Sequence, residues 1–151
     1  MLRTLTEADL PALLALDAAT NNHPWSESSW RSSLAGHLCL GLFTPGRLAG
    51  FCVVMPLVDE AELLLIAVAP ELQRQGHAST LLQAAMVELQ QRGMVQLFLE
   101  VRAGNCTAQA FYARHGFVQT GLRKGYYPLD REREDALIYT LDSINCGAMS
   151  R

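Results

Sequence analysis

The sequence predicts a single domain of the mixed α/β class. Its 151 residues are the length of one ordinary domain, and no internal repeat, low-complexity tract or linker divides them. Hydrophobic residues make up 50% of the chain and charged residues 18%, which favours a packed core over disorder. Segments with the pattern of strands precede and follow segments with helical spacing in mixed order, and this order indicates a mixed α/β fold.

The first half of the chain predicts two helices, a β-hairpin and a further strand. Helix starts are indicated by capping residues, Thr6 ahead of two acidic side chains and Ser26 after the break at Pro24. Pro45-Gly46 is typical of a turn between two strands. The expected elements are a helix from Thr6 with apolar Leu10, Leu13, Leu14 and Ala18, a helix from Ser26 to about Leu34, and strands over residues 37–43, 48–56 and 59–69.

The second half predicts the strongest helix and three more strands. Apolar residues recur there at the spacing of one buried helical face, and Gly93 is suited to end the helix. Asn105 can cap a short helix that ends near Arg114. The remaining features are the helical face Ala78, Leu81, Leu82, Ala85, Met86 and Leu89, a strand over 95–101 with Val95, Leu97, Leu99 and Val101 on one side, a strand after Gly116-Phe117, and a last strand over 136–141.

Charge and cysteine content narrow the classes of function. The net charge of −3 argues against a nucleic-acid-binding protein, whose usual mark is a basic face. No apolar run reaches the length of a membrane span, and the N-terminus lacks the features of a signal peptide. The cysteines show neither CxxC pairing nor metal-ligand spacing with the histidines, so we expect free thiols in a reducing compartment and no metal. They are Cys39, Cys52, Cys106 and Cys146.

One segment, residues 66–78, carries chemistry. A buried strand leads through a short loop into the start of the amphipathic helix, which presents unpaired N–H groups and the positive end of the helix dipole. Gly76 and Ala78 are small enough for a phosphate group to approach the main chain. The segment is neither a Walker loop nor a dinucleotide fingerprint, because it lacks Gly-Lys-Ser/Thr and has too few glycines. The pattern indicates an anion site, with an ordinary turn as the alternative.

The same segment, Gln73-x-x-Gly76-x-Ala78 after a strand, resembles the acetyl-CoA loop of the Gcn5-related N-acetyltransferase (GNAT) family. Asn105 at the head of a helix and the stretch Phe-Tyr-Ala-Arg-His-Gly-Phe at 111–117 are similar to another element of that family. The resemblance extends over residues 2–141. It implies a GNAT domain over 1–141, with a mixed, mostly antiparallel sheet flanked by helices and splayed at the acetyl-CoA strand, followed by a flexible tail at 142–151.

Within the family, six stretches in order resemble the RimI-type enzymes, which acetylate the N-terminal alanine of a small-subunit ribosomal protein. Two departures are His77, where Leu or Ile is common, and Ala78, which replaces the more usual second glycine. The resemblance implies a bacterial, cytoplasmic monomer or weak dimer whose partner is a basic protein N-terminus, not nucleic acid or a membrane. The six stretches are Pro24-Trp25-Ser26, Asp59-Glu60-Ala61, Gln73-Arg74-Gln75-Gly76, Leu99-Glu100-Val101-Arg102, Tyr126-Tyr127-Pro128 and Glu134-Asp135-Ala136.

The resemblance implies that an amine attacks the thioester carbon of acetyl-CoA directly. Only a neutral amine is nucleophilic. A terminal α-amine has a pKa of about 8 and a lysine one of about 10.4, so the α-amine is more easily deprotonated by a base. Glu100 would be the base that removes the proton, and Tyr112 the acid that protonates the departing thiolate. The alternatives are a surface Glu100 paired with Arg102, which shares its strand face, and a Tyr112 that is an ordinary core aromatic.

The resemblance also implies which residues hold acetyl-CoA. Backbone groups of Ile66, Ala67 and Val68 would contact the acetyl group and the pantetheine arm, which would lie like an added strand. Asn105 would contact the same arm while capping its helix. His77 is either a surface residue or, when protonated, a phosphate contact. The residues that would wrap the pyrophosphate are Arg74, Gln75, Gly76, His77, Ala78 and Ser79.

Two acidic clusters are candidates for binding a basic acceptor, with a solvated charged rim as the alternative. Charge reversal at Asp59 and Glu60 is expected to raise the Michaelis constant for the peptide and to leave that for acetyl-CoA unchanged. The clusters are Asp59, Glu60 and Glu62 beside the cofactor strand, and Glu132, Glu134 and Asp135 near the last strand.

Three functions remain open to the sequence. The first is N-terminal α-amino acetylation of a ribosomal protein, and the second is a GNAT for a small amine, such as a polyamine or aminoglycoside, or for other protein N-termini. The third is a CoA-binding module without catalysis. The presence of both Glu100 and Tyr112 favours an enzyme over the module.

Overall fold

The computed structural model describes residues 1–128 and 133–142. Two short 3-10 turns, Glu7–Asp9 and Pro70–Leu72, precede α1 and α3. None of the helices described is long and apolar enough to cross a bilayer. In chain order the elements are β1 (Leu2–Thr4), α1 (Leu10–Thr20), α2 (Glu27–Gly36), β2 (Leu38–Thr44), β3 (Arg47–Pro56), β4 (Glu60–Val68), α3 (His77–Gln91), β5 (Gln96–Arg102), α4 (Cys106–Arg114), β6 (Val118–Pro128) and β7 (Arg133–Asp142).

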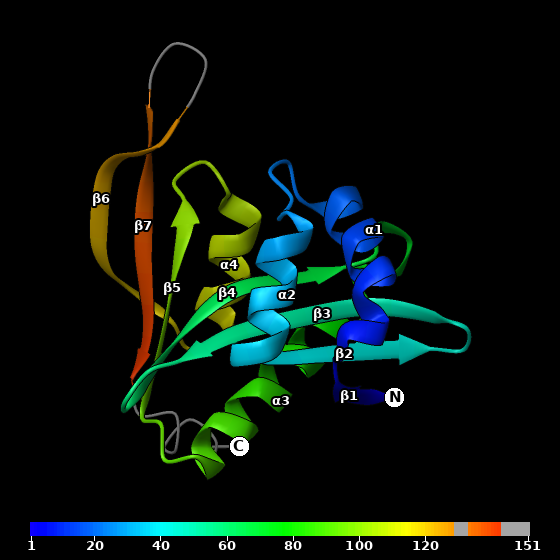
Figure 1. Cartoon of the computed structure of the whole chain (residues 1–151). Coiled ribbons are helices and arrows are strands. Elements are labelled where there is room, and N and C mark those ends of the chain that lie inside the picture. The colour runs from blue at the N-terminus through cyan, green and yellow to red at the C-terminus, as the bar shows by residue number, and fades with distance from the viewer. Residues whose placement is uncertain (129–132, 143–151) are drawn as a thin grey trace.

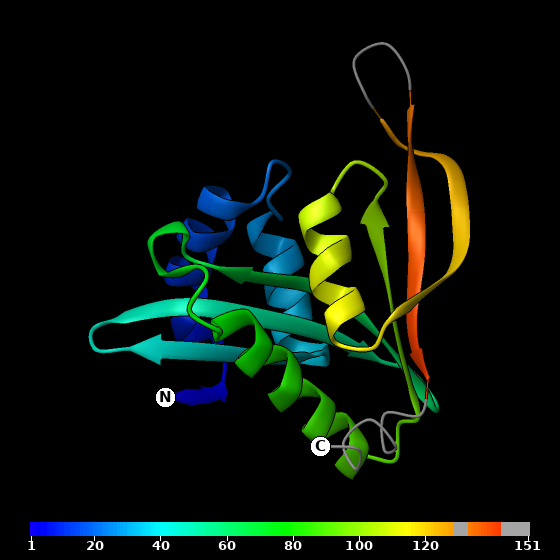
Figure 2. The same ribbon diagram turned by 180° about the vertical axis from the view of Figure 1, so that it is seen from behind.

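The strands form one sheet of seven, in the order β1-β2-β3-β4-β5-β7-β6. Its pairs are antiparallel except for β4 and β5, which run parallel. Helices α1 and α2 cover one face of the sheet and α3 and α4 the other, as the front and back views show (Figures 1 and 2). The mixed, mostly antiparallel α/β fold predicted from the sequence is confirmed.

The sheet opens between its two parallel strands. Strand β4 pairs with β5 only over Glu60–Glu62, opposite residues 96–98, and the two strands then separate. Each remains paired with its other neighbour, β4 with β3 as far as Val68 and β5 with β7 as far as Arg102. A bulge at Leu64 shifts the β3–β4 register within the separated part. The edge of β4 that faces the opening is therefore left without a strand partner.

A hydrophobic cluster on each face holds the helices in place. On one face, Leu81, Leu82, Ala85 and Leu89 of α3 are completely buried against the sheet, as their helical spacing predicts. On the other face, Trp30 of α2 packs edge-on against Phe51 of β3, with ring centroids 5.1 Å apart. The opening between β4 and β5 is thus set between two layers of packed helices.

The structure differs from the sequence predictions at strand ends. Strand β1 was not expected, because three residues are too few for a recognisable alternation. Strand β7 begins at Arg133 rather than at residue 136, since pairing with β6 extends it through polar residues. Val95 lies outside β5 and is exposed, so its assignment to the apolar side of that strand was wrong. Of the expected tail, residues 143–151 lie outside the described part.

Candidate active site

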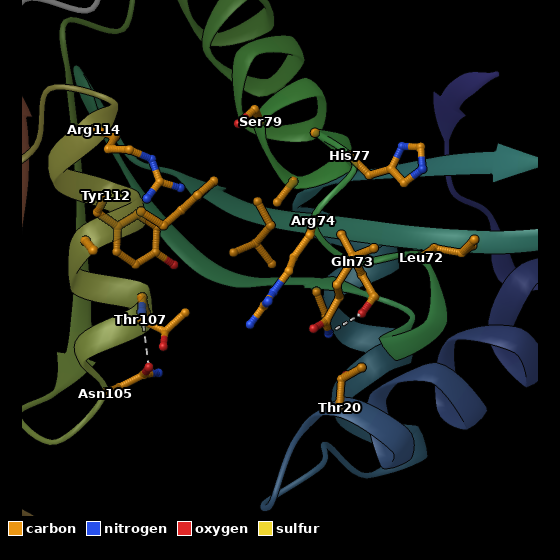
Figure 3. A pocket seen from close by; sticks show the side chains of 18 of the residues that line it. Thr20, Leu72, Gln73, Arg74, His77, Ser79, Asn105, Thr107, Tyr112 and Arg114 are labelled. Atoms are coloured by element: carbon orange, nitrogen blue, oxygen red, sulfur yellow. Dashed lines mark hydrogen bonds between the residues drawn. The ribbon is translucent and has the colours of Figure 1, made fainter.

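Two adjoining cavities occupy the opening in the sheet. The larger, of about 880 Å³, lies between the end of β4, the start of α3 and one face of α4 (Figure 3). The smaller, of about 280 Å³, is bounded by β4, β5, the end of α1 and Tyr127 of β6. They meet along residues that line both, namely Thr20, Ile66, Ala67, Asn105, Ala108 and Tyr112.

The loop before α3 is built to present main-chain donors to the larger cavity. The Gln73 amide anchors the loop by donating to the carbonyl of Val68 at 2.9 Å. Gly76 at the helix N-cap has a left-handed φ of 84° and no side chain with which to cap the helix. The first helical bond runs from Thr80 N to Gly76 O at 3.0 Å, so the N–H groups of residues 77–79 have no partner within the helix. Such a donor set suits a phosphate group.

Most of the residues predicted to hold acetyl-CoA line this cavity. Gln75 does not, and is exposed on the loop. Figure 3 shows the His77 ring turned away from α4. Asn105 caps α4 by accepting from Ala108 N at 3.1 Å, as predicted. The predicted residues that line the cavity are Ile66, Ala67, Val68, Arg74, Gly76, His77, Ala78, Ser79 and Asn105.

Charge is divided between the two cavities. In the described part of the chain the larger cavity is lined by Arg74, His77 and Arg114 and by no carboxylate. The smaller cavity is lined by the carboxylates of Asp17 and Glu100 and by Arg102. The first cavity therefore favours an anionic ligand and the second a cationic one.

Glu100 lies at the junction of β5 with the smaller cavity. Its side chain is 19% exposed, and its Oε2 atom is buried without a hydrogen-bond partner among the described residues. The Nε of Arg123 on β6 lies 3.1 Å from that oxygen and forms an ion pair outside hydrogen-bond geometry. The alternative pairing of Glu100 with Arg102 was wrong, because Arg102 pairs with Glu134 of β7 at 3.2 Å.

Tyr112 on α4 lies where the two cavities meet. It is 8% exposed, and its ring packs against Phe117 with centroids 5.6 Å apart. Burial raises the pKa of its hydroxyl well above the ordinary value, with a smaller contribution from Cys52. Tyr112 is thus a core aromatic that also lines both cavities, and its hydroxyl keeps its proton at neutral pH.

The acidic clusters fall in different places. Asp59 and Glu60 lie at the closed end of β4 and line neither cavity. Glu62 is close enough to Glu100 for the two to interact: burial and the charge of Glu100 raise the pKa of Glu62, and Arg123 lowers it.

The second cluster makes contacts within the protein. Besides its ion pair with Arg102, Glu134 accepts a bond from Gly104 N at 2.8 Å. Asp135 accepts from Gly125 N at 2.8 Å, at the bulge of β6. Glu132 lies outside the described residues. Glu134 therefore ties β7 to the end of β5 and the loop before α4, and Asp135 ties it to β6.

Several lining residues were missed by the sequence analysis. Thr107, Phe111 and Arg114 lie on the face of α4 that borders the larger cavity. They could have been predicted from their positions, because residues four and three apart in a helix share one face. Asp17 and Tyr127 of the smaller cavity gave no comparable local signal, since they come from distant segments. Among the described residues, no group of three or more His, Cys, Asp or Glu could hold a metal ion.

A sheet that opens between two parallel strands, with the N-terminus of a helix at the opening, is typical of a class of acyl-transferring enzymes. The Acetyltransferase (GNAT) family matches residues 4–117, and the chain belongs to this family of acetyltransferases, as its sequence predicted.

The chain is similar over nearly its whole length to two curated relatives and to one solved structure. The chain is 40% identical over 139 residues to the [ribosomal protein bS18]-alanine N-acetyltransferase of Escherichia coli (strain K12), covering 91% of this chain and 94% of that one. It is 38% identical over 143 residues to the enzyme of the same name from Haemophilus ducreyi, covering 93% and 99%. The crystal structure of the ribosomal-protein-S18-alanine N-acetyltransferase from Escherichia coli superimposes with a TM-score of 0.88 at 38% identity, covering 95% and 93%.

Proposed function

We propose that the protein transfers the acetyl group of acetyl-CoA to the N-terminal α-amine of a protein, and that its acceptor is the N-terminal alanine of ribosomal protein bS18. The relatives that share about 40% of its residues over nearly its whole length carry that activity in their names. The observation that carries the proposal is that a cation-lined and a carboxylate-lined cavity meet at Tyr112, while Glu100 lines the second of them.

The residues of the larger cavity fit acetyl-CoA. The free N–H groups at the start of α3, together with Arg74, would hold the pyrophosphate. The unpartnered edge of β4 at Ile66–Val68 offers main-chain groups to the amide-containing pantetheine arm, and Asn105 borders the same path. When bound there, acetyl-CoA supplies an activated acetyl thioester.

Glu100 of the smaller cavity and Tyr112 at the junction would move the protons. Glu100 takes the proton from the acceptor's ammonium group, either directly or through a water, so that a neutral nitrogen forms the new N–C bond. As the C–S bond breaks, the Tyr112 hydroxyl would give its proton to the departing sulfur, and the second proton, which the nitrogen loses on becoming an amide, would return to the tyrosine oxygen directly or through a water. The raised pKa of Tyr112 keeps the hydroxyl protonated at neutral pH but also makes it a weaker acid, so the proton would move only as negative charge develops on the sulfur.

The smaller cavity would receive the acceptor. Its carboxylates and the neighbouring Glu62 favour a cationic N-terminus, and Tyr127 forms part of its wall. Glu134 and Asp135 would act indirectly, by holding Arg102 and the β6 bulge in place. Asp59 and Glu60 would contribute only a distant field, which salt screens.

The test is acetylation of a synthetic peptide with the N-terminal sequence of bS18, with the acetylated nitrogen located by mass spectrometry. We expect acetyl on the α-amine, none on a peptide whose N-terminus is blocked, and a turnover number about 100-fold to 10,000-fold lower for Glu100→Gln. Glu88→Gln on the outer face of α3 is the matched control and should behave as wild type. Acetylation of polyamines or aminoglycosides in preference to the peptide would overturn the proposed acceptor, and binding of acetyl-CoA without turnover on any amine would overturn the activity.

A further inference from the structure

Two arginines of the larger cavity stand apart from the other arginines of the protein. Among the arginines whose side chains the structure describes, Arg3, Arg31, Arg47, Arg92, Arg102 and Arg123 each form an ion pair with a carboxylate. The two without such a pair in the described part of the chain are Arg74 and Arg114, and both line the same cavity. In a chain with 15 acidic residues and a net charge of −3, this leaves two uncompensated cations at one site.

The two arginines come from opposite walls of the cavity. Arg74 belongs to the loop before α3, where it adopts a left-handed φ of 64° that is uncommon for a residue with a side chain. Arg114 lies in the last turn of α4, on the face that also carries Thr107 and Phe111. Figure 3 shows both guanidinium groups directed into the cavity from these separate elements. Two cations on separate walls suit a ligand with two separate anionic groups.

The proposed cofactor has two such groups, a pyrophosphate and a phosphomonoester on the 3′ position of its ribose. The N–H groups at the start of α3 and the adjacent Arg74 form one anion site, which suits the pyrophosphate. Among the described arginines that line the cavity, Arg114 is then the one left without an anionic partner, on the opposite wall. We propose that Arg114 binds the 3′-phosphate of CoA and makes the protein distinguish CoA from dephospho-CoA, an inference that rests on the proposed use of acetyl-CoA.

The affinities of the protein for CoA and dephospho-CoA, measured by calorimetry, test the role of Arg114 without the need for a catalysed reaction. Wild-type protein should bind CoA roughly tenfold or more tightly than dephospho-CoA, the effect of one hydrogen-bonded charge pair. Arg114→Gln should weaken CoA binding to the level of dephospho-CoA and leave dephospho-CoA binding unchanged. Arg114→Lys should keep part of the preference, because it retains the charge without the planar fork.

Two further variants make the result specific. Arg92→Gln removes an exposed arginine of similar size that pairs with Glu88 outside the cavity, and it should bind both ligands as wild type does. Arg74→Gln should weaken both ligands by the same factor, since both carry the pyrophosphate. Thermal melting of each variant in the absence of ligand checks that it is folded.

The outcomes separate this inference from the proposed function. If wild type binds CoA but Arg114→Gln keeps the full preference over dephospho-CoA, or loses affinity for both equally, the role of Arg114 is wrong and the use of acetyl-CoA stands. If wild type binds neither ligand, both proposals are wrong.

Discussion

Arg123 on β6 and Glu100 on β5 form an ion pair across the intervening strand β7, with Nε of the arginine 3.1 Å from Oε2 of the glutamate. The arginine side chain is 53% exposed and the glutamate 19%, so the cation lies on the solvent side of the carboxylate. Its guanidinium also lies over the Tyr126 ring, 4.8 Å from the centroid. An incoming ammonium group therefore meets a carboxylate that already carries a cation.

This contact predicts that Arg123 competes with the acceptor. Replacing it by Gln should lower the peptide KM a few-fold, the scale of a partly exposed ion pair, and leave the KM for acetyl-CoA unchanged. Arg123→Lys, which keeps the charge, should stay close to wild type. Steady-state kinetics with each substrate varied in turn measures both constants. A higher peptide KM in Arg123→Gln would show instead that the arginine helps to bind the acceptor.

Tyr112→Phe should lower kcat with little change in acetyl-CoA affinity, because the ring packing against Phe117 is retained while the proton donor is lost. The raised pKa of Tyr112 also predicts how kcat depends on pH. A hydroxyl whose pKa lies above the ordinary value of about 10 stays protonated throughout the neutral and mildly alkaline range. Wild-type kcat should thus not fall between pH 8 and pH 10 on account of this group. Equal turnover in the variant and wild type would remove Tyr112 from the mechanism.

Glu62, rather than Asp59 or Glu60, should govern the preference for a basic acceptor. None of the three lines either cavity, but Glu62 lies close enough to Glu100 and Arg123 to interact with both. Glu62→Gln should raise the KM of a peptide with basic residues after its N-terminus more than that of a neutral peptide. The double variant Asp59→Asn, Glu60→Gln is the control at the same strand. We expect it to change the KM of the basic peptide and that of the neutral peptide by less than Glu62→Gln does. A larger effect in the double variant would restore the role predicted for those residues from sequence.

The ion pair between Arg3 and Asp9 predicts a pH-dependent stability. The Arg3 hydrogen bond at 2.8 Å lowers the pKa of Asp9, aided by Thr6 N and opposed by burial. A carboxyl whose pKa is lower in the folded state stabilises the fold fully above its unfolded pKa, about 3.9, and loses that effect as pH falls through the folded value. Asp9→Asn should therefore lower the melting temperature at pH 7, and its deficit should shrink as the pH falls below 4. A deficit that is constant with pH would show that lost packing, not charge, is responsible.

The parts of the site that lie close together in sequence could be predicted from it. The helical face of α3 and the small residues of its N-terminal loop are local patterns, and the structure places them as expected. The opening between β4 and β5 leaves no mark in periodicity, and it was expected only from the family resemblance. The partner of Glu100 could not be read from spacing, because the strand order β5-β7-β6 brings Arg123 from a non-adjacent strand. The i, i+2 spacing on one strand face offered Arg102 as an alternative partner, but Arg102 pairs with Glu134 of β7.

The lining shared by the two cavities has a consequence for kinetics. Ile66, Asn105 and Tyr112 border both cavities. The two substrates would therefore bind in adjoining cavities at the same time, rather than one after the other in a single cavity. Catalysis would then require both to be present at once, without an acetylated enzyme as an intermediate. Double-reciprocal plots of initial velocity should intersect and not run parallel, and a stable bisubstrate conjugate joining CoA to the peptide N-terminus should bind more tightly than either part alone.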